Sequence, residues 1–393
     1  MSEYRSFEKI LGALPHFRSV AAGVKEMLIS NLVMIGEIPS PTFGEAARVK
    51  FLQERFSDFG LQNCSSDEMD NALAILPGKD KRGKRNILLV AHADTVFPAE
   101  QDHTITVMAD RVSGPGLSDD GLGLATLVTL PALLDRLDIE LESNIILMGA
   151  SRSLGRGNLE GLRFFLENNA MPIQAGICVE GAQLGRLSIA SLGMARGEIE
   201  CRVPQSHDWT RFGTANAILT MNEIINRIME IPVPLRPRSS VVLGTIVGGK
   251  DFNTLARYSK LGFEIRRESG AVVEEIAQQL DDIVAEVGSQ TGARVHLEMF
   301  ARRQPGGISF AHPLARRIRR IMEALDLPQR AFPSTSELSA FIDRRIPAVT
   351  IGISSCEAPN EMGEEIEISP MFTGLAQLIG ILLAIDGGCC DEG

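Results

Sequence analysis

Residues 88–98 read LLVAHADTVFP, an apolar run that ends in polar side chains. The run has the composition of a buried β-strand. Side chains two apart in a strand project to the same face, so His92 and Asp94 face the same way. Ligands bind at the carboxyl ends of strands in open α/β sheets. We therefore predict a functional site at His92, where the imidazole could bind a metal and Asp94 could hold its other nitrogen. A hydrogen-bonded histidine at a strand end is the alternative.

Strand-like and helical segments alternate around this stretch. Residues 71–78, 144–150 and 175–181 are short apolar runs bounded by turn residues, and residues 121–137 and 158–169 have helical patterning. This alternation predicts an α/β domain with a mostly parallel sheet. Between them and the C-terminal part, residues 195–304 follow the order strand, helix, strand, strand, helix, strand, which is typical of a small α+β ferredoxin-like domain.

The second domain is therefore predicted to be inserted into the first, which comprises residues 1–194 and 305–393. The chain has 393 residues and a formal charge of −11, which argues against nucleic-acid binding and an anionic membrane surface. Six scattered cysteines form no CxxC pair. The N-terminus has no signal-peptide pattern, and the longest apolar stretch, residues 375–385, is shorter than the ~20 residues that span a bilayer. We expect a cytoplasmic protein.

Two further strand or turn positions carry acidic side chains. SGPGLSDDGLGLA (113–125) places Asp119 and Asp120 in a glycine-rich turn before a helix, and Glu180 follows the apolar run at 175–179. Aspartates at a helix start are also common caps, which is the alternative interpretation. His92, Asp119 and Glu180 together, at the ends of successive elements of one sheet, predict a metal site.

These motifs, with the inserted domain, resemble the M20 family of metallopeptidases and aminoacylases, which includes tripeptidase T, carboxypeptidase G-type enzymes and succinyl-diaminopimelate desuccinylase. The resemblance extends over nearly the whole chain: IPSPTFGEAARVKFLQERFSDFG (38–60), GTIVGGKDFNTLA (244–256), FEIRR (263–267) and IPAVTIG (346–352) resemble further family segments. It implies a phosphorylase/hydrolase-like, zinc exopeptidase fold with an inserted lid and dimerisation domain.

The family holds two metals, usually zinc, bridged by one aspartate. One metal maps to His92, Asp119 and Glu180, and Asp94 matches the residue that orients the histidine. This half of the site is intact in the sequence. It implies one divalent metal per chain at most, with zinc as the first expectation, or none.

The other half departs from the family. Its glutamate pair, a general base and a metal ligand, aligns with Arg152 and Ser153, and its C-terminal histidine ligand aligns with Asn360. No histidine follows His312 in the chain, although Glu361 offers a carboxylate. Arginine cannot act as a base because its pKa exceeds ~12, and its charge disfavours a nearby cation.

The inserted domain offers residues that resemble family substrate contacts. His207 resembles a lid histidine that reaches the substrate carbonyl, and Asn253 and Arg266 resemble contacts to an oxyanion or a substrate carboxylate. The alternatives are a surface-loop histidine, a turn asparagine and a strand-edge charge, and Arg267 could serve in place of Arg266. Ser336 and Glu337 resemble a Ser-Asp pair of the family.

Three functions follow from this comparison. The first is an M20-type peptidase-like protein, possessing one metal half-site, that binds a small carboxylate, peptide or N-acyl amino acid in the interdomain cleft. Arg152 would contact the anion, and ordinary two-metal hydrolysis would be absent, as in a pseudoenzyme. The second is an active one-metal hydrolase that uses Glu361 or water as base. The third is a non-catalytic structural or regulatory homodimer, joined through the lid domain.

Overall fold

The computed structural model describes residue 4 and residues 6–80, 83–204, 215–232, 239–334 and 336–390. It divides the chain into two compact units, residues 1–190 with 307–393, and residues 191–306. The sequence analysis placed the boundaries after residues 194 and 304, within a few residues of these.

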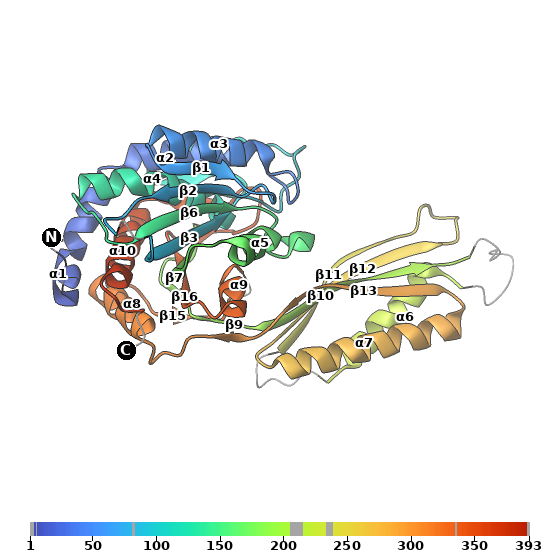
Figure 1. Ribbon diagram of the computed structural model, residues 1–393. Helices are drawn as coiled ribbons and strands as arrows, with labels where there is room; N and C mark the ends of the chain where they lie inside the picture. The colour runs from blue at the N-terminus through green and yellow to red at the C-terminus, as the bar shows by residue number, and fades with distance from the viewer. Residues whose placement is uncertain are drawn as a thin grey trace. The chain divides into compact units, whose positions relative to one another are not determined.

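A mixed eight-stranded sheet runs through the first unit in the order β1-β2-β6-β3-β7-β16-β8-β15 (Figure 1). The four central strands β6, β3, β7 and β16 are parallel neighbours. β1 and β2 pair antiparallel with their neighbours, as does β8 with β16. The predicted α/β fold is confirmed, and its parallel pairing is centred on the strands that carry the candidate site. The strands are β1 (Gln62–Ser66), β2 (Ala72–Leu76), β3 (Asn86–His92), β6 (Asn144–Ala150), β7 (Ile173–Glu180), β8 (Arg186–Ser188), β15 (Arg330–Ala331) and β16 (Ala348–Gly352).

Both faces of this sheet are covered by helices, which explains why its central strands are apolar throughout. In β3, Ile87 and Leu89 join the core cluster of α1 to α4, α8 and α10, whereas Leu88 and Val90 join the cluster of α5 and α9. The helices are α1 (Phe7–Ala22), α2 (Lys25–Gly36), α3 (Ala46–Asp58), α4 (Leu122–Arg136), α5 (Glu160–Asn168), α8 (Pro313–Ala324), α9 (Leu338–Asp343) and α10 (Ile368–Asp386).

Two smaller sheets also occur among the described residues. One has the order β17-β18-β5-β4, and the other pairs β14 with β9. Their bounds are β4 (Thr106–Val107), β5 (Arg111–Ser113), β9 (Ala190–Ser191), β14 (Gly306–Gly307), β17 (Cys356–Glu357) and β18 (Glu365–Glu367).

Two helical segments have the length and apolar composition of a membrane span, whereas the sequence analysis found no apolar stretch of that length. The segment 117–136 and α10 are long and apolar enough, by length and composition, to cross a membrane, and α10 has a mean hydropathy of 1.9. In their most apolar windows, 89% and 83% of the residues are buried inside the fold. Their apolar character is therefore explained by packing in the core of the first unit.

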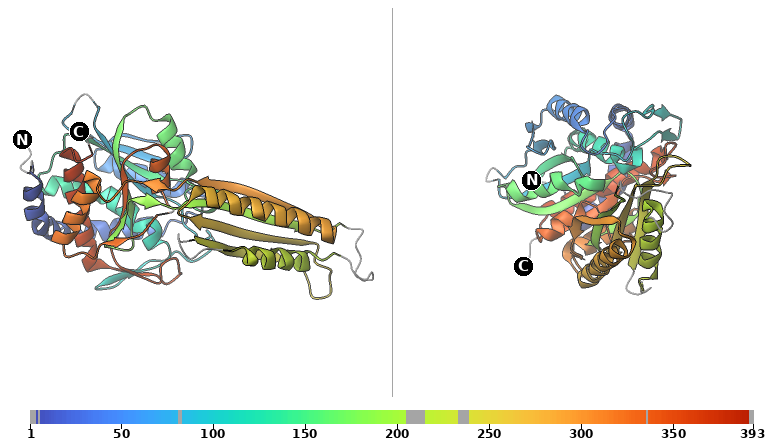
Figure 2. Two further views of the ribbon diagram at one scale, coloured as in Figure 1. Left: turned by 90° about the horizontal axis from the view of Figure 1, so that it is seen from below. Right: turned by 90° about the vertical axis from the view of Figure 1, so that its right-hand side faces the viewer.

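The second unit has the predicted β-α-β-β-α-β order. Its four strands form an antiparallel sheet in the order β11-β12-β10-β13, and α6 and α7 run along it (Figures 1 and 2). Ile199 of β10 and Leu261 of β12 pack with the helices in a core of its own. The first and last strands are neighbours, with Met194 opposite Arg303. The bounds are β10 (Gly193–Arg202), α6 (Ala217–Glu230), β11 (Ser239–Gly248), β12 (Tyr258–Arg267), α7 (Gly270–Thr291) and β13 (Arg294–Arg303).

A substitution at Gly374 tests how closely α10 packs on the sheet. A Cβ atom at this position would lie 2.1 Å from the carbonyl oxygen of Ile353, which is a backbone atom and cannot move aside easily. We expect Gly374→Ala to lower the free energy of unfolding by about 1–3 kcal/mol. Gly12 of α1 is the matched control because a Cβ there meets no atom within 4 Å. Gly12→Ala should raise stability by up to about 1 kcal/mol. Thermal unfolding midpoints measure both, and equal shifts of the same sign would contradict this packing.

Candidate metal centre

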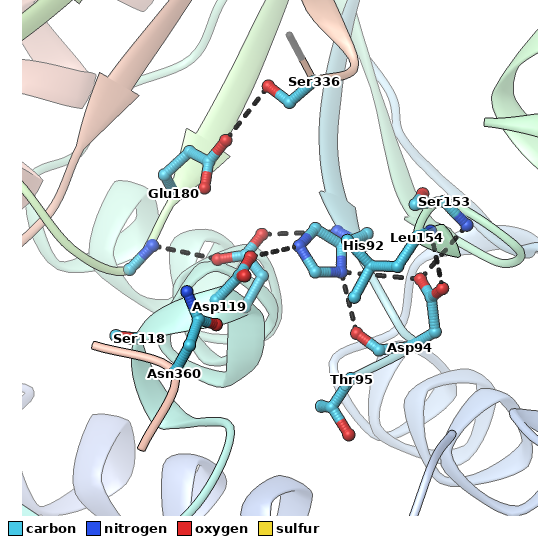
Figure 3. A network of polar contacts seen from close by, with 12 residues as sticks. His92, Asp94, Thr95, Ser118, Asp119, Ser153, Leu154, Glu180, Ser336 and Asn360 are labelled. Atoms are coloured by element: carbon cyan, nitrogen blue, oxygen red, sulfur yellow. Dashed lines mark hydrogen bonds and ion pairs between the residues drawn. The ribbon is translucent and has the colours of Figure 1, made fainter. Parts of the chain in front are cut away.

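Three side chains with metal-binding atoms meet at the carboxyl edge of the central strands (Figure 3). His92 ends β3, Glu180 ends the neighbouring parallel strand β7, and Asp119 lies in the turn before α4. One ligand atom of each lies within 4.8 Å of the others. An imidazole with two carboxylates is a donor set that zinc, manganese or cobalt accepts. These three residues, called the metal half-site below, therefore fit one divalent ion.

His92 is held on both sides of its ring. Nδ1 donates to the backbone carbonyl oxygen of Asp94 over 2.8 Å, and Nε2 donates to Oδ1 of Asp119 over 2.7 Å. The Asp94 carboxylate lies 3.5 Å from Nδ1, so the backbone of Asp94 is the nearer partner. Fixing Nδ1 aims Nε2 at Asp119, which is how proteins present an imidazole to a metal. A metal ion at Nε2 would take the place of that proton.

Carboxylates dominate the charge of the half-site. Burial disfavours the imidazolium of His92, but Asp119, Asp94 and Glu337 together outweigh burial and raise the pKa of His92 well above its ordinary value. Burial raises the pKa of Glu180, although the guanidinium of Arg186 opposes this effect. Burial also raises the pKa of Asp120 well above the ordinary range. These buried carboxyl groups would be stabilised in their charged form by a cation.

The carboxylate of Asp120 connects the turn before α4 to the ends of β3 and β7. Its Oδ2 accepts from the backbone N–H of His92 over 3.3 Å, and its Oδ1 accepts from the backbone N–H of Gly181 over 2.9 Å. The side chain is 1% exposed. One turn of the chain later, Gly123 leaves room for it, because a Cβ there would lie 2.2 Å from Oδ1. The Gly-rich sequence around the aspartates is therefore explained by close approach to this carboxylate.

The Arg152 side chain, at the predicted position of the general base, is balanced by two acidic residues. Nη1 donates to Oε2 of Glu160 over 3.2 Å, and Nη2 lies 3.7 Å from Oδ2 of Asp70. The guanidinium also lies over the ring of Phe43, 5.9 Å from its centroid. The sequence analysis foresaw none of these partners. Beside it, Ser153 is 2% exposed and its Oγ has no hydrogen-bond partner in the described part of the chain.

The backbone after β6 is fixed by carboxylates from other segments. Asp94 accepts from the N–H groups of Ser153 over 3.2 Å and Leu154 over 2.8 Å (Figure 3). Glu45 accepts from the N–H of Arg152 over 2.9 Å. Asp94 therefore holds both the ring of His92 and the loop where the family carries its glutamate pair.

The segment that contains Asn360 is tied to the Asp119 turn. Glu364, which is fully buried, accepts from the backbone N–H of Asn360 over 3.0 Å and from the hydroxyl of Ser118 over 2.6 Å. The Asn360 segment therefore lies close to the turn beside the half-site, and the match of Asn360 to a histidine ligand stays a prediction. Glu361, which the sequence analysis weighed as a base, is exposed.

Sequence reasoning missed the arginine that acts on the half-site. Arg186 Nη1 lies 3.7 Å from Oε1 of Glu180, and the same oxygen accepts from Oγ of Ser336 over 3.1 Å. Glu337 is 3% exposed, and its Oε1 has no hydrogen-bond partner among the described residues. Arg186 stands in GRLSIA, which matches no motif, so only the strand pairing places it here.

Two of the three predicted substrate contacts of the inserted domain lie within the described residues. His207 lies outside the described residues. Asn253 is exposed in the connection between β11 and β12. Arg266 of β12 forms an ion pair with Glu264, which also accepts from Arg196 over 2.6 Å. Their contact with a substrate stays a prediction.

Comparisons with known proteins agree on the fold. Residues 189–292 match the peptidase dimerisation domain of the M20 peptidases. A dipeptidase of Saccharomyces cerevisiae has a TM-score of 0.76 at 12% identity, with 95% of this chain and 98% of that one covered. A tripeptidase of Staphylococcus aureus has a TM-score of 0.72 at 19% identity, with 92% and 98% covered. A dinuclear metal-binding M20 peptidase of Bacillus subtilis has a TM-score of 0.62 at 14% identity, with 93% and 98% covered.

One curated relative is similar in sequence over a short segment. A protein of Thermococcus kodakarensis, described as a LysW-lysine/LysW-ornithine hydrolase, is 48% identical over 71 residues. The match spans 18% of this chain and 19% of that relative. The chain therefore carries the M20 peptidase dimerisation domain within the fold of the M20 peptidases, and the resemblance that its motifs predicted is confirmed.

Proposed function

We propose that this protein uses an M20-type amide-hydrolase scaffold to bind one divalent metal ion and a small carboxylate ligand, a peptide or an N-acyl amino acid. Ordinary two-metal hydrolysis is lost in this proposal. The observation that carries it is the asymmetry of the candidate centre. His92, Asp119 and Glu180 converge, whereas the positions aligned with the remaining family ligands and base hold Arg152, Ser153 and Asn360.

The chemistry of the half-site supports binding more than turnover. A bound divalent ion would polarise a ligand oxygen, and zinc is the ion that best fits this donor set. Neighbouring residues hold the metal ligands in place: Asp94 fixes the ring of His92, and Ser336 fixes Glu180. General-base catalysis contributes typically ~10²–10⁴-fold in rate, and Arg152 cannot supply it.

A one-metal hydrolase is the second candidate, and Glu337 favours it. This carboxylate is buried, has an oxygen without a hydrogen-bond partner in the described chain, and belongs to the group of charges that act on His92. It is a better-placed base candidate than the exposed Glu361. A homodimer joined by the inserted domain and a cytoplasmic location complete the proposal.

Metal content is the first test. We expect one zinc, manganese or cobalt ion per chain in protein purified without chelators, measured by elemental analysis. His92→Ala should remove it, since it deletes the central ligand, while the exposed His16→Ala should leave it unchanged. Two ions per wild-type chain would contradict the proposal, and so would none.

A restoration experiment tests whether the ligands and the base of the second metal site can be put back. The triple variant Arg152→Glu, Ser153→Glu, Asn360→His should bind a second ion and raise kcat/KM toward N-acyl amino acids or dipeptides by about 10²–10⁴-fold. Arg152→Ala alone is the control: it removes the charge but adds no ligand, so it should keep one ion per chain. A second ion in this control would mean that charge alone excludes the metal. A triple variant with one ion would mean that the alignment is wrong.

A substitution in the edge strand of the second unit tests the proposed dimer. β11 lies at the edge of its sheet in the described chain and exposes Val242, Ile246 and Val247. Such an edge is suited to pairing with another chain. Light scattering should give a dimer mass for the wild type and a monomer mass for Val247→Glu. Val107→Glu, at a similarly exposed valine of the first unit, should stay dimeric. A monomeric wild type would remove this part of the proposal.

A further inference from the structure

A cavity of about 640 Å³ opens beside the metal half-site at the edge of the large sheet. It is lined by Gln183, Arg186, Arg330, Phe332 and Pro333. We infer that this cavity is a carboxylate-binding subsite, in which Arg186 and Arg330 hold the acid group of the ligand and Phe332 contacts its apolar part.

Strand pairing places the two arginines side by side. Arg186 of β8 and Arg330 of β15 are directly paired partners in parallel strands. Paired residues of neighbouring strands project from the same face of a sheet, so both guanidinium groups are directed to one cavity. Like charges this close repel each other unless an anion lies between them.

The protein itself provides little negative charge for this pair. The described part of the chain gives the Arg330 side chain no acidic partner. Arg186 donates to Oγ of Ser188 over 2.9 Å, and among the described residues the acidic groups that act on it are Glu180, at 3.7 Å, and Asp119. Both are also ligands of the proposed metal ion, and a carboxylate shared with a cation is a weaker counter-charge for Arg186. The cavity is therefore left with positive charge that a ligand can balance.

Two arginine forks suit a carboxylate, because each guanidinium can donate two parallel hydrogen bonds to its oxygens. Phe332 is 47% exposed and offers an apolar wall in the same cavity. The ligand class is thus an acid with an apolar substituent. Arg186 also lies 3.7 Å from Glu180 of the half-site, so a polar group further along the ligand would be directed toward the metal. That last step and the weakened counter-charge of Arg186 rest on the proposed function, whereas the exposed charge of Arg330 in the cavity does not.

Calorimetric titration of the full-length protein with N-acetyl-L-leucine tests the subsite, and N-acetyl-L-leucinamide is the matched neutral probe. The wild type should bind the acid at least ~10-fold more tightly than the amide, which corresponds to two arginine contacts that the amide cannot use. Arg330→Gln should abolish this preference and leave the metal content unchanged. Arg316→Gln, at an exposed arginine of α8, should keep the preference. Phe332→Ala should weaken acid and amide alike.

The outcomes separate this inference from the proposed function. Equal affinity for acid and amide in the wild type would overturn the subsite, as would binding of neither probe. A preference that survives in Arg330→Gln would also overturn it. If the preference is present and depends on Arg330 while the protein contains no metal, the subsite stands and the proposed metal function fails. If the metal is bound but Arg330→Gln does not change the preference, the proposed metal function stands and the subsite fails.

Discussion

The buried carboxylate of Asp120 is the interaction on which the candidate centre depends. It receives the backbone N–H at the end of β3 and the backbone N–H that follows β7, and it lies in the turn that carries Asp119. Three segments that are distant in sequence are thereby fixed at one point. An unpaired carboxylate here would cost several kcal/mol, since burying a charge without partners is strongly unfavourable. Asp120 thereby brings together the segments that carry His92, Asp119 and Glu180, and contacts of Asp94 and Ser336 orient the side chains of His92 and Glu180.

At the carboxyl ends of the central strands, the metal half-site and the loop after β6 are held in place by different kinds of contact. In the metal half-site, three side chains that can bind a metal face one another. On the β6 side, the loop is held through its backbone, by Asp94 and Glu45, and the side chain of Arg152 is held by Glu160 and Asp70. Backbone anchoring of this kind does not depend on which side chains the loop carries. It explains how the loop keeps its place although the residues aligned with the family's glutamate pair differ.

Much of this architecture could be predicted from the sequence, and the limits have physical causes. His92 and Glu180 were identifiable because buried strands are apolar runs, and their polar ends are visible in one sequence. The inserted domain was identifiable by its order of elements. The partners of Arg152 were not, because Asp70 and Glu160 come from separate segments. Arg186 and Arg330 were not either, because two short edge strands have no periodicity and only their register brings them together. The apolar extent of α10 was underestimated because scattered small and polar residues interrupt its apolar run.

The first and last strands of the second unit lie next to each other, with Met194 opposite Arg303. The insert therefore begins and ends at nearly the same point in space. Closing such an insert adds little entropy cost to the host fold, since its two ends need not be brought together by the host chain. A segment with this geometry and a core of its own can be removed from the chain without rerouting the strands on either side. The α/β host and its insert are in this sense separable folding units.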